Sequence, residues 1–337
     1  MVHTGCAMSV LRRPRALARR RPPHDDDPLV FAGSASPRLT DSICAGLRVT
    51  RGQSEVVRFS EGTLFVRVLE NVRGRSVYLV QSTVFPTNAN FMELLFWIDA
   101  FSRASADSVT VVVPYFSYAK GDKKDEPRVS IRARVCADAI EIAGADRVVT
   151  LDLHAPQIQG FFRIPVDDLY ALPYLCDAIE QAGLREPVVV SPDAGFAKRA
   201  RRFASRLGAP LAIADKVRTD HTESPDLVEI IGEVSERDAV IVDDFTTTAG
   251  TLVETAEQLV ARGARSVTAV VTHGVFAPGS MERLDASPIE RLIVTDSIET
   301  QPVELSPKVS VVSVAPLFAE AIGRIHRRES ISVLFRD

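Results

Sequence analysis

The chain has 337 residues and a mass of 36.8 kDa, enough for two compact domains that each bury a core of their own. Acidic residues outnumber basic ones by 44 to 40, which argues against a general nucleic-acid-binding surface, because such a surface needs an excess of lysine and arginine. No apolar run approaches the roughly 20 residues that cross a bilayer, so the composition also excludes a membrane-spanning protein.

The first 27 residues differ from the rest of the chain. Residues 1–24 contain no acidic residue and no apolar periodicity, and they are rich in arginine. We interpret residues 1–27 as a basic, disordered leader in preference to an organelle transit peptide. Alternatively, translation starts at Met8 or later. The cysteines, Cys6, Cys44, Cys136 and Cys176, lie far apart without C-x-x-C spacing. This favours a reducing compartment, and we expect a cytoplasmic protein.

From residue 29 onward, short β-rich runs alternate with longer amphipathic stretches. Strands are expected at residues 29–32, 65–69, 77–81, 109–113, 147–151, 188–191, 211–214, 239–242, 266–271 and 291–294. Nearly continuous β-branched runs such as VTVVV and VTAVV are typical of strands buried on both faces of a mainly parallel sheet. Helices are expected at residues 88–104, 131–143, 196–207, 252–262 and 317–327. This alternation predicts an α/β fold with helices on both faces of the sheets.

The alternating pattern breaks at residues 173–187, after which a second β-α series begins. We therefore expect a first domain over residues 28–175 and a second over residues 176–337, with a terminal helix that packs back. In both halves strands end in polar residues, at VVVP and LDLH in the first and at VVVSPD and VIVDD in the second. Because ligands of open α/β sheets bind beyond the carboxyl ends of the strands, chemistry is expected there.

The most informative segment is AVIVDDFTTTAGT at residues 239–251, followed at once by a helical pattern. An apolar strand delivers Asp243 and Asp244 to its end, and the turn after it opens a helix whose first N–H groups have no intrahelical partner. These amides and the threonine hydroxyls predict a cradle for one phosphate. Acids beside a phosphate suit a ligand with hydroxyls next to its phosphate, such as a sugar phosphate. A capped helix after an acid-ended strand is the plainer alternative.

Three further segments place polar side chains after strands. His154 follows the strand of LDLHAPQIQGFF, Asp193 lies in VVVSPDAGF, and Lys216 and Arg218 stand in ADKVRTDHT. A neutral imidazole in such a place can bind Mg²⁺ or contact phosphate oxygens, although a hydrogen-bonded edge histidine is the common outcome for the residue taken alone. Asp193 alone could equally be a helix cap, and the two cations could stand in an ordinary solvated loop.

Together these segments resemble the ribose-phosphate pyrophosphokinase family over residues 29–335. DDFTTTAGT is similar to the phosphoribosyl-binding motif that this family shares with type I phosphoribosyltransferases, whereas DLHAPQIQGFF resembles a signature of the synthetases alone. The resemblance implies two phosphoribosyltransferase-like domains, each a mainly parallel sheet flanked by helices. It also implies that ribose 5-phosphate is bound by Asp243 and Asp244 at its hydroxyls and by Thr247, Thr248, Ala249, Gly250 and Thr251 at its phosphate. Many synthetases carry aspartate at the position of Thr247.

The same resemblance assigns the roles of the other three segments. It implies that His154 and Asp193 bind Mg²⁺ and that Asp193, Ala194 and Gly195 wrap the diphosphate. Diphosphoryl transfer needs positioning and positive charge more than covalent help. The resemblance therefore implies that Lys216, Arg218 and His154 are catalytic, with the two cations stabilising the transition state.

Two segments of the first half resemble the family's nucleotide-binding motifs. FSEGT at residues 59–63 is similar to an adenine-contacting turn, and YAKGDKKDEPR at residues 118–128 is similar to an ATP-binding segment. Family members usually carry Arg-Gln at Lys120 and Gly121, and lysine cannot reproduce the planar, bidentate contacts of arginine. Donor affinity or base preference is therefore expected to differ. The residues expected to contact the nucleotide are Phe59, Glu61, Lys120 and Asp122.

The resemblance predicts an enzyme that transfers the diphosphoryl group of Mg-ATP to ribose 5-phosphate for nucleotide biosynthesis. Family members are homo-oligomers built from dimers, up to hexamers, in which the adenine turn reaches a neighbour's site. Two alternatives stay open. One is a non-catalytic regulatory or scaffold paralogue, which is favoured by departures from the family pattern at Lys120, Gly121 and Thr247. The chain also departs from that pattern at Thr63, where glutamate is usual, and at Phe196, where a second glycine is usual. A phosphoribosyltransferase that consumes the product would share the phosphate cradle but would not need LDLHAPQIQGFF.

Overall fold

The computed structural model describes residues 27–217, 227–299 and 302–335. Its first sheet contains five parallel strands in the order β1-β4-β5-β6-β7. In β5 and β6 every residue after the first is buried, as their continuous apolar runs predict. The strands are β1 (Leu29–Ala32), β4 (Ser76–Val80), β5 (Ser108–Val113), β6 (Arg147–Leu151) and β7 (Val166–Leu169).

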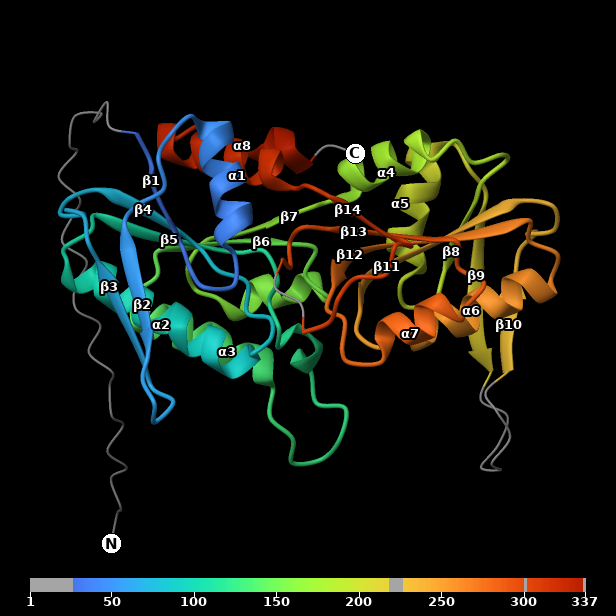
Figure 1. Ribbon diagram of the computed structural model, residues 1–337, viewed down its shortest axis with the longest axis horizontal. Coiled ribbons are helices and arrows are strands. Elements are labelled where there is room, and N and C mark those ends of the chain that lie inside the picture. The colour runs from blue at the N-terminus through green and yellow to red at the C-terminus, as the bar shows by residue number, and fades with distance from the viewer. Residues whose placement is uncertain (1–26, 218–226, 300–301, 336–337) are drawn as a thin grey trace, which may run out of the picture.

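Helices and a hairpin surround this sheet. The helices are α1 (Pro37–Leu47), α2 (Thr87–Arg103) and α3 (Arg132–Ala143). The hairpin of β2 (Ser54–Arg58) and β3 (Leu64–Val68) forms a separate antiparallel sheet, and its turn extends away from the body of the molecule (Figure 1). Short 3-10 turns at Ala119–Gly121 and Pro156–Phe161 follow β5 and β6 at the edge where those strands end.

The second sheet has seven strands in the order β10-β9-β8-β11-β12-β13-β14. All neighbours are parallel except β10 and β9, which form an antiparallel pair. The strands are β8 (Val188–Ser191), β9 (Leu211–Val217), β10 (Leu227–Ile231), β11 (Asp238–Thr246), β12 (Ser266–Gly274), β13 (Arg291–Thr295) and β14 (Val309–Val312). The helices are α4 (Leu172–Gln181), α5 (Ala197–Leu207), α6 (Gly250–Ala261), α7 (Ser280–Asp285) and α8 (Ala315–Arg327).

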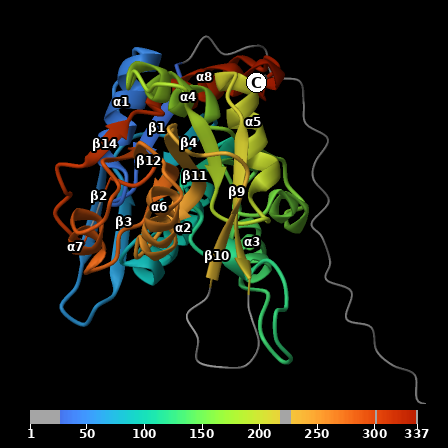
Figure 2. The same cartoon turned by 90° about the vertical axis from the view of Figure 1, so that its right-hand side faces the viewer.

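The two sheets lie side by side along the long axis of the molecule and share one apolar core (Figures 1 and 2). That core joins Val80 of β4 to Val240 of β11, among many others. Helix α8 packs on α1 so closely that a methyl group on Gly46 would lie 3.0 Å from Cβ of Ala319. The division between residues 175 and 176 stays a prediction; α4, which contains both, packs on α5, β13 and β14.

The predicted α/β architecture of two mainly parallel sheets is confirmed, and every predicted strand and helix is present. The expected end of β11 at residue 242 was wrong, because pairing with β12 continues through Thr246 and carries both aspartates within the strand. The sequence pattern did not reveal α1, α4, α7, β2, β7, β10 or β14. Helices α1 and α4 each begin with a proline in their first turn, a residue that also marks loops.

The structure also bears on the expectations for the cysteines, the basic leader and membrane-spanning segments. Cys44, Cys136 and Cys176 are buried free thiols, whereas Cys6 and residues 1–26 of the basic leader lie outside the described residues. Among the described helices none is long and apolar enough to cross a membrane.

Helix α1 begins against a carboxylate from the other half of the molecule. The N–H groups of Arg38 and Leu39 donate to the two carboxylate oxygens of Glu299 over 2.8 and 3.0 Å. The side chain of Glu299 is only 6% exposed, and Arg38 adds an ion pair of 3.3 Å to it. A carboxylate at a helix N-terminus complements the helix dipole and accepts from N–H groups that lack intrahelical partners. Glu299 therefore ties the two halves together.

Replacing Glu299 by alanine is expected to lower the free energy of unfolding by about 1 to 2 kcal/mol, because a buried cap between the halves is lost. Urea denaturation followed by circular dichroism measures the change. Glu304→Ala, at an exposed position nearby in sequence, is the matched control and should leave the transition unchanged. A Glu299→Ala midpoint equal to that of the native chain would mean that water replaces the cap at no cost.

Candidate active site

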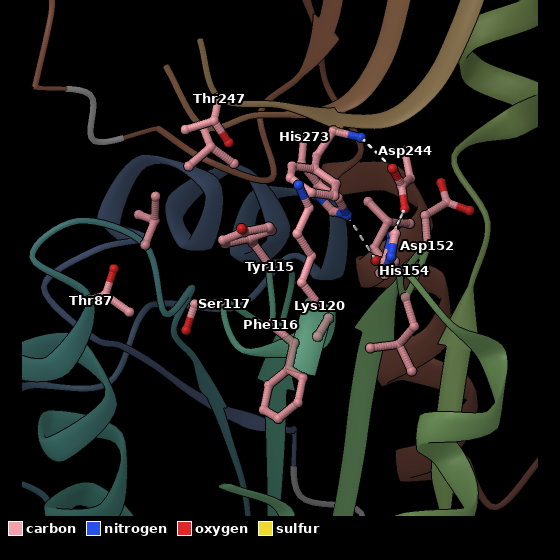
Figure 3. A pocket seen from close by; sticks show the side chains of 16 residues that line it. Thr87, Tyr115, Phe116, Ser117, Lys120, Asp152, His154, Asp244, Thr247 and His273 are labelled. Carbon is pink, nitrogen blue, oxygen red and sulfur yellow. Dashed lines mark hydrogen bonds and ion pairs between the residues drawn. The ribbon is translucent and has the colours of Figure 1, made fainter. Parts of the chain in front are cut away.

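A cavity of about 250 Å³ lies where the two sheets meet, at the carboxyl ends of their central strands. Residues that follow β4, β5 and β6 form its wall in the first half, and residues of β11 and β12 form its wall in the second (Figure 3). The side chains that face it include Tyr115, Lys120, His154, Asp244 and His273. The structure thus brings the LDLH and VIVDD segments together, as ligand sites of open α/β sheets require.

His154 and Asp244 form the central polar contact of this cavity. Nδ1 of His154 lies 2.6 Å from Oδ2 of Asp244, and a guanidinium nitrogen of Arg199 lies 3.8 Å from the same oxygen. Burial alone would raise the pKa of Asp244, but the hydrogen bond and charge of His154, with the charge of Arg199, lower it below the ordinary value. Asp244 is therefore the ionised member of the acid pair.

Asp243 behaves in the opposite way. Loss of solvation, followed by the charge of Asp244 beside it, raises the pKa of Asp243 well above its usual range. Oδ1 of Asp243 accepts from the N–H of Asp244 at 2.9 Å, which only partly offsets these effects. Of the two adjacent carboxyl groups at this strand end, Asp244 therefore loses its proton more readily than Asp243.

The backbone just before His154 takes an unusual conformation that other elements hold in place. Asp152 has a φ of 43°, in the left-handed region that most residues avoid. Its Oδ2 accepts from the hydroxyl of Thr272 at 2.8 Å and from the N–H of Ala171 at 3.0 Å. Because Thr272 belongs to β12, the second sheet fixes the turn that presents His154 from the first.

His273, also on β12, binds the same segment. Its Nε2 lies 3.0 Å from the carbonyl oxygen of Leu151, and its Nδ1 lies 2.8 Å from the hydroxyl of Ser297. A carbonyl only accepts, so Nε2 carries the proton. Burial lowers the pKa of His273, and the ring is therefore neutral at physiological pH. His273 acts as a fixed hydrogen-bond donor to the end of β6.

A third contact with this segment comes from Asp168 of β7. Oδ1 of Asp168 accepts from the N–H of Leu153 at 3.0 Å, and Arg199 donates to the carbonyl of Leu153. The other oxygen of Asp168 is buried and has no hydrogen-bond partner within the described part of the chain. Burial raises the pKa of Asp168 to about 7. This carboxyl is thus half protonated near neutral pH.

The shifted pKa of Asp168 predicts a pH dependence of stability. Between an ordinary carboxyl pKa and about 7 the folded chain binds this proton more tightly than the unfolded chain, so stability falls as pH rises through that window. Asp168→Asn keeps an acceptor for Leu153 but does not ionise, and we expect it to flatten this fall. Urea denaturation of both proteins at several values of pH from 4 to 8 would measure the difference, and parallel curves would contradict it.

Phe245, which follows the acid pair, organises two neighbouring side chains. The ammonium group of Lys120 lies 4.1 Å from the centroid of the Phe245 ring, and the His154 ring meets that ring edge-on at 5.7 Å. A cation over an aromatic face is held by the ring's negative electron density. Lys120 is thus tethered across the junction of the halves, with its charge at the cavity (Figure 3).

The predicted phosphate cradle follows the end of β11. Ala249 has a φ of 60° and precedes α6, which begins at Gly250. The N–H of Gly250 makes only a long contact of 3.4 Å, to the hydroxyl of Thr248. Within the described ranges, no protein group accepts from the N–H groups of Thr248, Ala249 and Thr251. These unpartnered donors fit an anion better than the plain helix cap, which would use a side chain to accept from them.

The turn that carries Asp193, Ala194 and Gly195 is exposed and does not line the cavity. Oδ1 of Asp193 accepts from the N–H of Phe196 at 2.8 Å, so Asp193 closes the turn that leads into α5 and does not cap the helix itself. Burial and the charge of Asp244 are the main causes of the raised pKa of Asp243, and the charge of Asp193 adds to them. Asp193 therefore lies on the same edge of the sheet as Asp243. No group of three or more histidine, cysteine or acidic residues able to hold a metal ion occurs in the described residues.

The remaining predicted residues fall in three places. Lys120 lines the cavity, and Asp122 follows it at the end of a 3-10 turn. Phe59 and Glu61 lie at the hairpin turn between β2 and β3 and do not line the cavity. Lys216 is near the end of β9, and Arg218 lies outside the described residues.

Sequence reasoning missed several residues that build this site: Tyr115, Asp152, Asp168, Arg199, Thr272 and His273. The rule that selected His154, a polar residue at the end of an apolar strand, also applies to His273 in VTAVVTHG. Arg199 and Asp168 had no such signal, because their roles depend on packing between elements that are distant in sequence.

Parallel sheets that meet at an acid pair and at a turn with unpartnered amides are typical of α/β proteins that bind phosphorylated ligands at this edge. Comparison with known proteins gives the family. Residues 29–144 match the N-terminal domain of ribose phosphate pyrophosphokinase, and residues 215–336 match the phosphoribosyl synthetase-associated domain. The chain therefore belongs to the ribose-phosphate pyrophosphokinase family.

Individual relatives agree with this assignment. A ribose-phosphate pyrophosphokinase from Rhizobium meliloti (strain 1021) is 48% identical over 91% of this chain and 99% of its own length. Another ribose-phosphate pyrophosphokinase, from Caldanaerobacter subterraneus subsp. tengcongensis, is 48% identical over 91% of this chain and 97% of its own length. The crystal structure of phosphoribosylpyrophosphate synthetase from Mycobacterium smegmatis superposes with a TM-score of 0.84 and 36% identity, over 90% of this chain and 100% of that one.

Proposed function

We propose that this chain transfers the β,γ-diphosphoryl group of ATP to the anomeric hydroxyl of ribose 5-phosphate, giving 5-phosphoribosyl 1-diphosphate and AMP. One observation carries the proposal: Nδ1 of His154, from the first half, lies 2.6 Å from Oδ2 of Asp244, from the second half. Asp244 belongs to β11, the strand that leads into the turn with unpartnered amides. In the reaction the C1 oxygen bonds to the β-phosphorus, the bond from that phosphorus to the α-phosphate oxygen breaks, and the hydroxyl proton is released.

The sugar phosphate would be bound by the end of β11 and the turn after it. Asp244, the ionised acid, would accept a hydrogen bond from one ribose hydroxyl, and Asp243, whose pKa is raised, would form a hydrogen bond with the neighbouring hydroxyl. The unpartnered amides between Thr247 and the start of α6 would donate to the 5-phosphate. Both ends of the substrate are then satisfied at once.

His154 and Asp193 fit a Mg²⁺ ion bound together with ATP. A histidine whose Nδ1 is held by a carboxylate commonly uses Nε2 for a metal, and within the described residues Asp193 uses only Oδ1, which accepts from the N–H of Phe196. Mg²⁺ binds few protein groups and keeps several waters, so a larger ligand cluster is not required. When bound, the ion would neutralise charge on the transferred phosphates.

Three side chains would place positive charge next to the diphosphoryl group that is transferred. Lys120 brings its ammonium group to the cavity, held over Phe245. Lys216 of β9 and Arg218, which comes two residues later in the sequence, would add two more cations around the β-phosphorus and the leaving AMP. None of these groups needs to form a covalent bond, because phosphoryl transfer is accelerated mainly by positioning and charge.

We also propose a homo-oligomer built from dimers, with a hexamer as its largest form. The hairpin turn exposes 46% of Phe59, which lies 6.4 Å from Phe65, and this aromatic pair does not line this chain's own cavity. In a dimer the turn, with Glu61, would complete the adenine site of a neighbour. Gel filtration of an active preparation that shows only monomers would overturn this. The free buried thiols support the proposal that the protein works in the cytoplasm.

The proposed function is tested by incubating the purified protein with Mg²⁺, ribose 5-phosphate and each nucleoside triphosphate in turn. Formation of AMP and 5-phosphoribosyl 1-diphosphate from ATP is the expected result. Product from other triphosphates as well would show the relaxed base selection that lysine at position 120 predicts. Absence of product with every donor would favour a regulatory or scaffold subunit.

A further inference from the structure

Arg283 of helix α7 lies directly against the start of helix α6. A methyl group placed on Gly250, the first residue of α6, would lie 2.9 Å from Nη1 of Arg283. The guanidinium therefore lies against the backbone of this turn, and a side chain at position 250 would make it shift. The same turn carries the amide donors of Thr248, Ala249 and Thr251, so the cation stands at the rim of the cradle.

This position is electrostatically unfavourable for an unpaired cation. The N-terminus of a helix carries a partial positive charge, which repels a guanidinium and attracts an anion. Arg283 is exposed, and its side chain makes no ion pair or hydrogen bond with another described residue. Water can solvate this exposed guanidinium, and its charge can pair with an anion that enters the cradle.

The cradle also needs a cation for its proposed ligand. The 5-phosphate of a sugar phosphate carries a charge between about -1.5 and -2 at neutral pH. Residues 243–251 contain two aspartates and neither lysine nor arginine, so their side chains repel that charge rather than attract it. A guanidinium offers several N–H donors in a plane that matches two phosphate oxygens.

We propose that Arg283 binds the 5-phosphate of ribose 5-phosphate and supplies the positive charge that the amide cradle lacks. The inference rests on the proposed function for the identity of the ligand. Because the contact is made to a phosphate that does not react, it stabilises the ground state and the transition state equally. Its loss therefore raises KM for ribose 5-phosphate and leaves kcat nearly unchanged.

The test compares Arg283→Gln and Arg283→Lys with the native protein. Arg262→Gln is the matched control, because Arg262 is an exposed arginine at the other end of α6. We expect Arg283→Gln to raise KM for ribose 5-phosphate about 10- to 100-fold, with KM for ATP and kcat within a few-fold of native. Arg283→Lys should recover part of the loss, and the control should behave as native.

Calorimetric titration with ribose 5-phosphate alone separates this inference from the proposed function. Native protein that binds ribose 5-phosphate but forms no product would overturn the reaction and leave the role of Arg283 intact, provided that Arg283→Gln binds more weakly. Equal affinity of native protein and Arg283→Gln would overturn the role of Arg283. An equal rise in KM for both substrates, or a lower melting temperature in both variants, would also overturn it by showing a merely structural role.

Discussion

Asp244→Asn is expected to lower kcat/KM for ribose 5-phosphate by about 100- to 1000-fold. The amide has the same shape as the carboxylate but carries no charge, and one of its two ends is a donor. Oδ2 of Asp244 accepts from His154 at 2.6 Å and Oδ1 accepts from the N–H of Phe245 at 2.9 Å, so either orientation of the amide sets a donor against a former donor. The proposed ribose hydroxyl also loses its ionised acceptor.

The loss at Asp244 should be accompanied by freer movement of His154. Steady-state kinetics measure the first effect, and the chemical shifts of the His154 ring measure the second by NMR. Glu257→Gln makes the same chemical change at an exposed site on α6 and should be neutral. A variant with kcat/KM within a few-fold of native would remove Asp244 from the sugar site.

Lys216→Ala should reduce kcat by about 100- to 1000-fold while the affinity for ribose 5-phosphate changes only a few-fold. The reason is that its charge acts on the diphosphoryl group only as that group transfers, and not on the sugar. A rapid-quench measurement of a single turnover reports the chemical step, and calorimetry reports binding. An unchanged rate would exclude Lys216 from the mechanism.

Lys216→Arg tests what kind of interaction the lysine makes. Arginine keeps the positive charge but spreads it over a wider, planar group. An intermediate rate would indicate that charge matters more than the position of a single ammonium group. A rate as low as that of Lys216→Ala would instead indicate that the shape of the ammonium group matters.

Local sequence was sufficient for much of the fold and for the centre of the candidate site. Runs such as VTVVV are buried on both faces as predicted, because a two-sided parallel strand leaves a continuous apolar signature. His154 and Asp244 were selected because polar residues at the ends of apolar strands meet at one edge of a parallel sheet. Their contact between halves confirms that this edge is shared.

Features that depend on distant packing could not be read in the same way. Strand β7, with the sequence VDDL, has polar residues at positions that the strand pattern would fill with apolar ones. Its Asp168 is explained only by the N–H of Leu153, which the fold brings to it. Likewise, neither the closeness of Arg283 to Gly250 nor the support of Leu151 by His273 follows from any local spacing.

The packing of α8 on α1 has a consequence for how the protein is made. Leu39 and Ile43 of α1 share their core with Phe318 and Ile322 of α8, which are synthesised after every described strand of both sheets. Until α8 has been made, the part of α1 that it covers therefore faces solvent, even when the first sheet has formed. A nascent chain that stalls before α8 would expose this apolar surface of α1 to chaperones or to other chains. Cellular quality control could then detect the unfinished chain at a site outside the candidate active site.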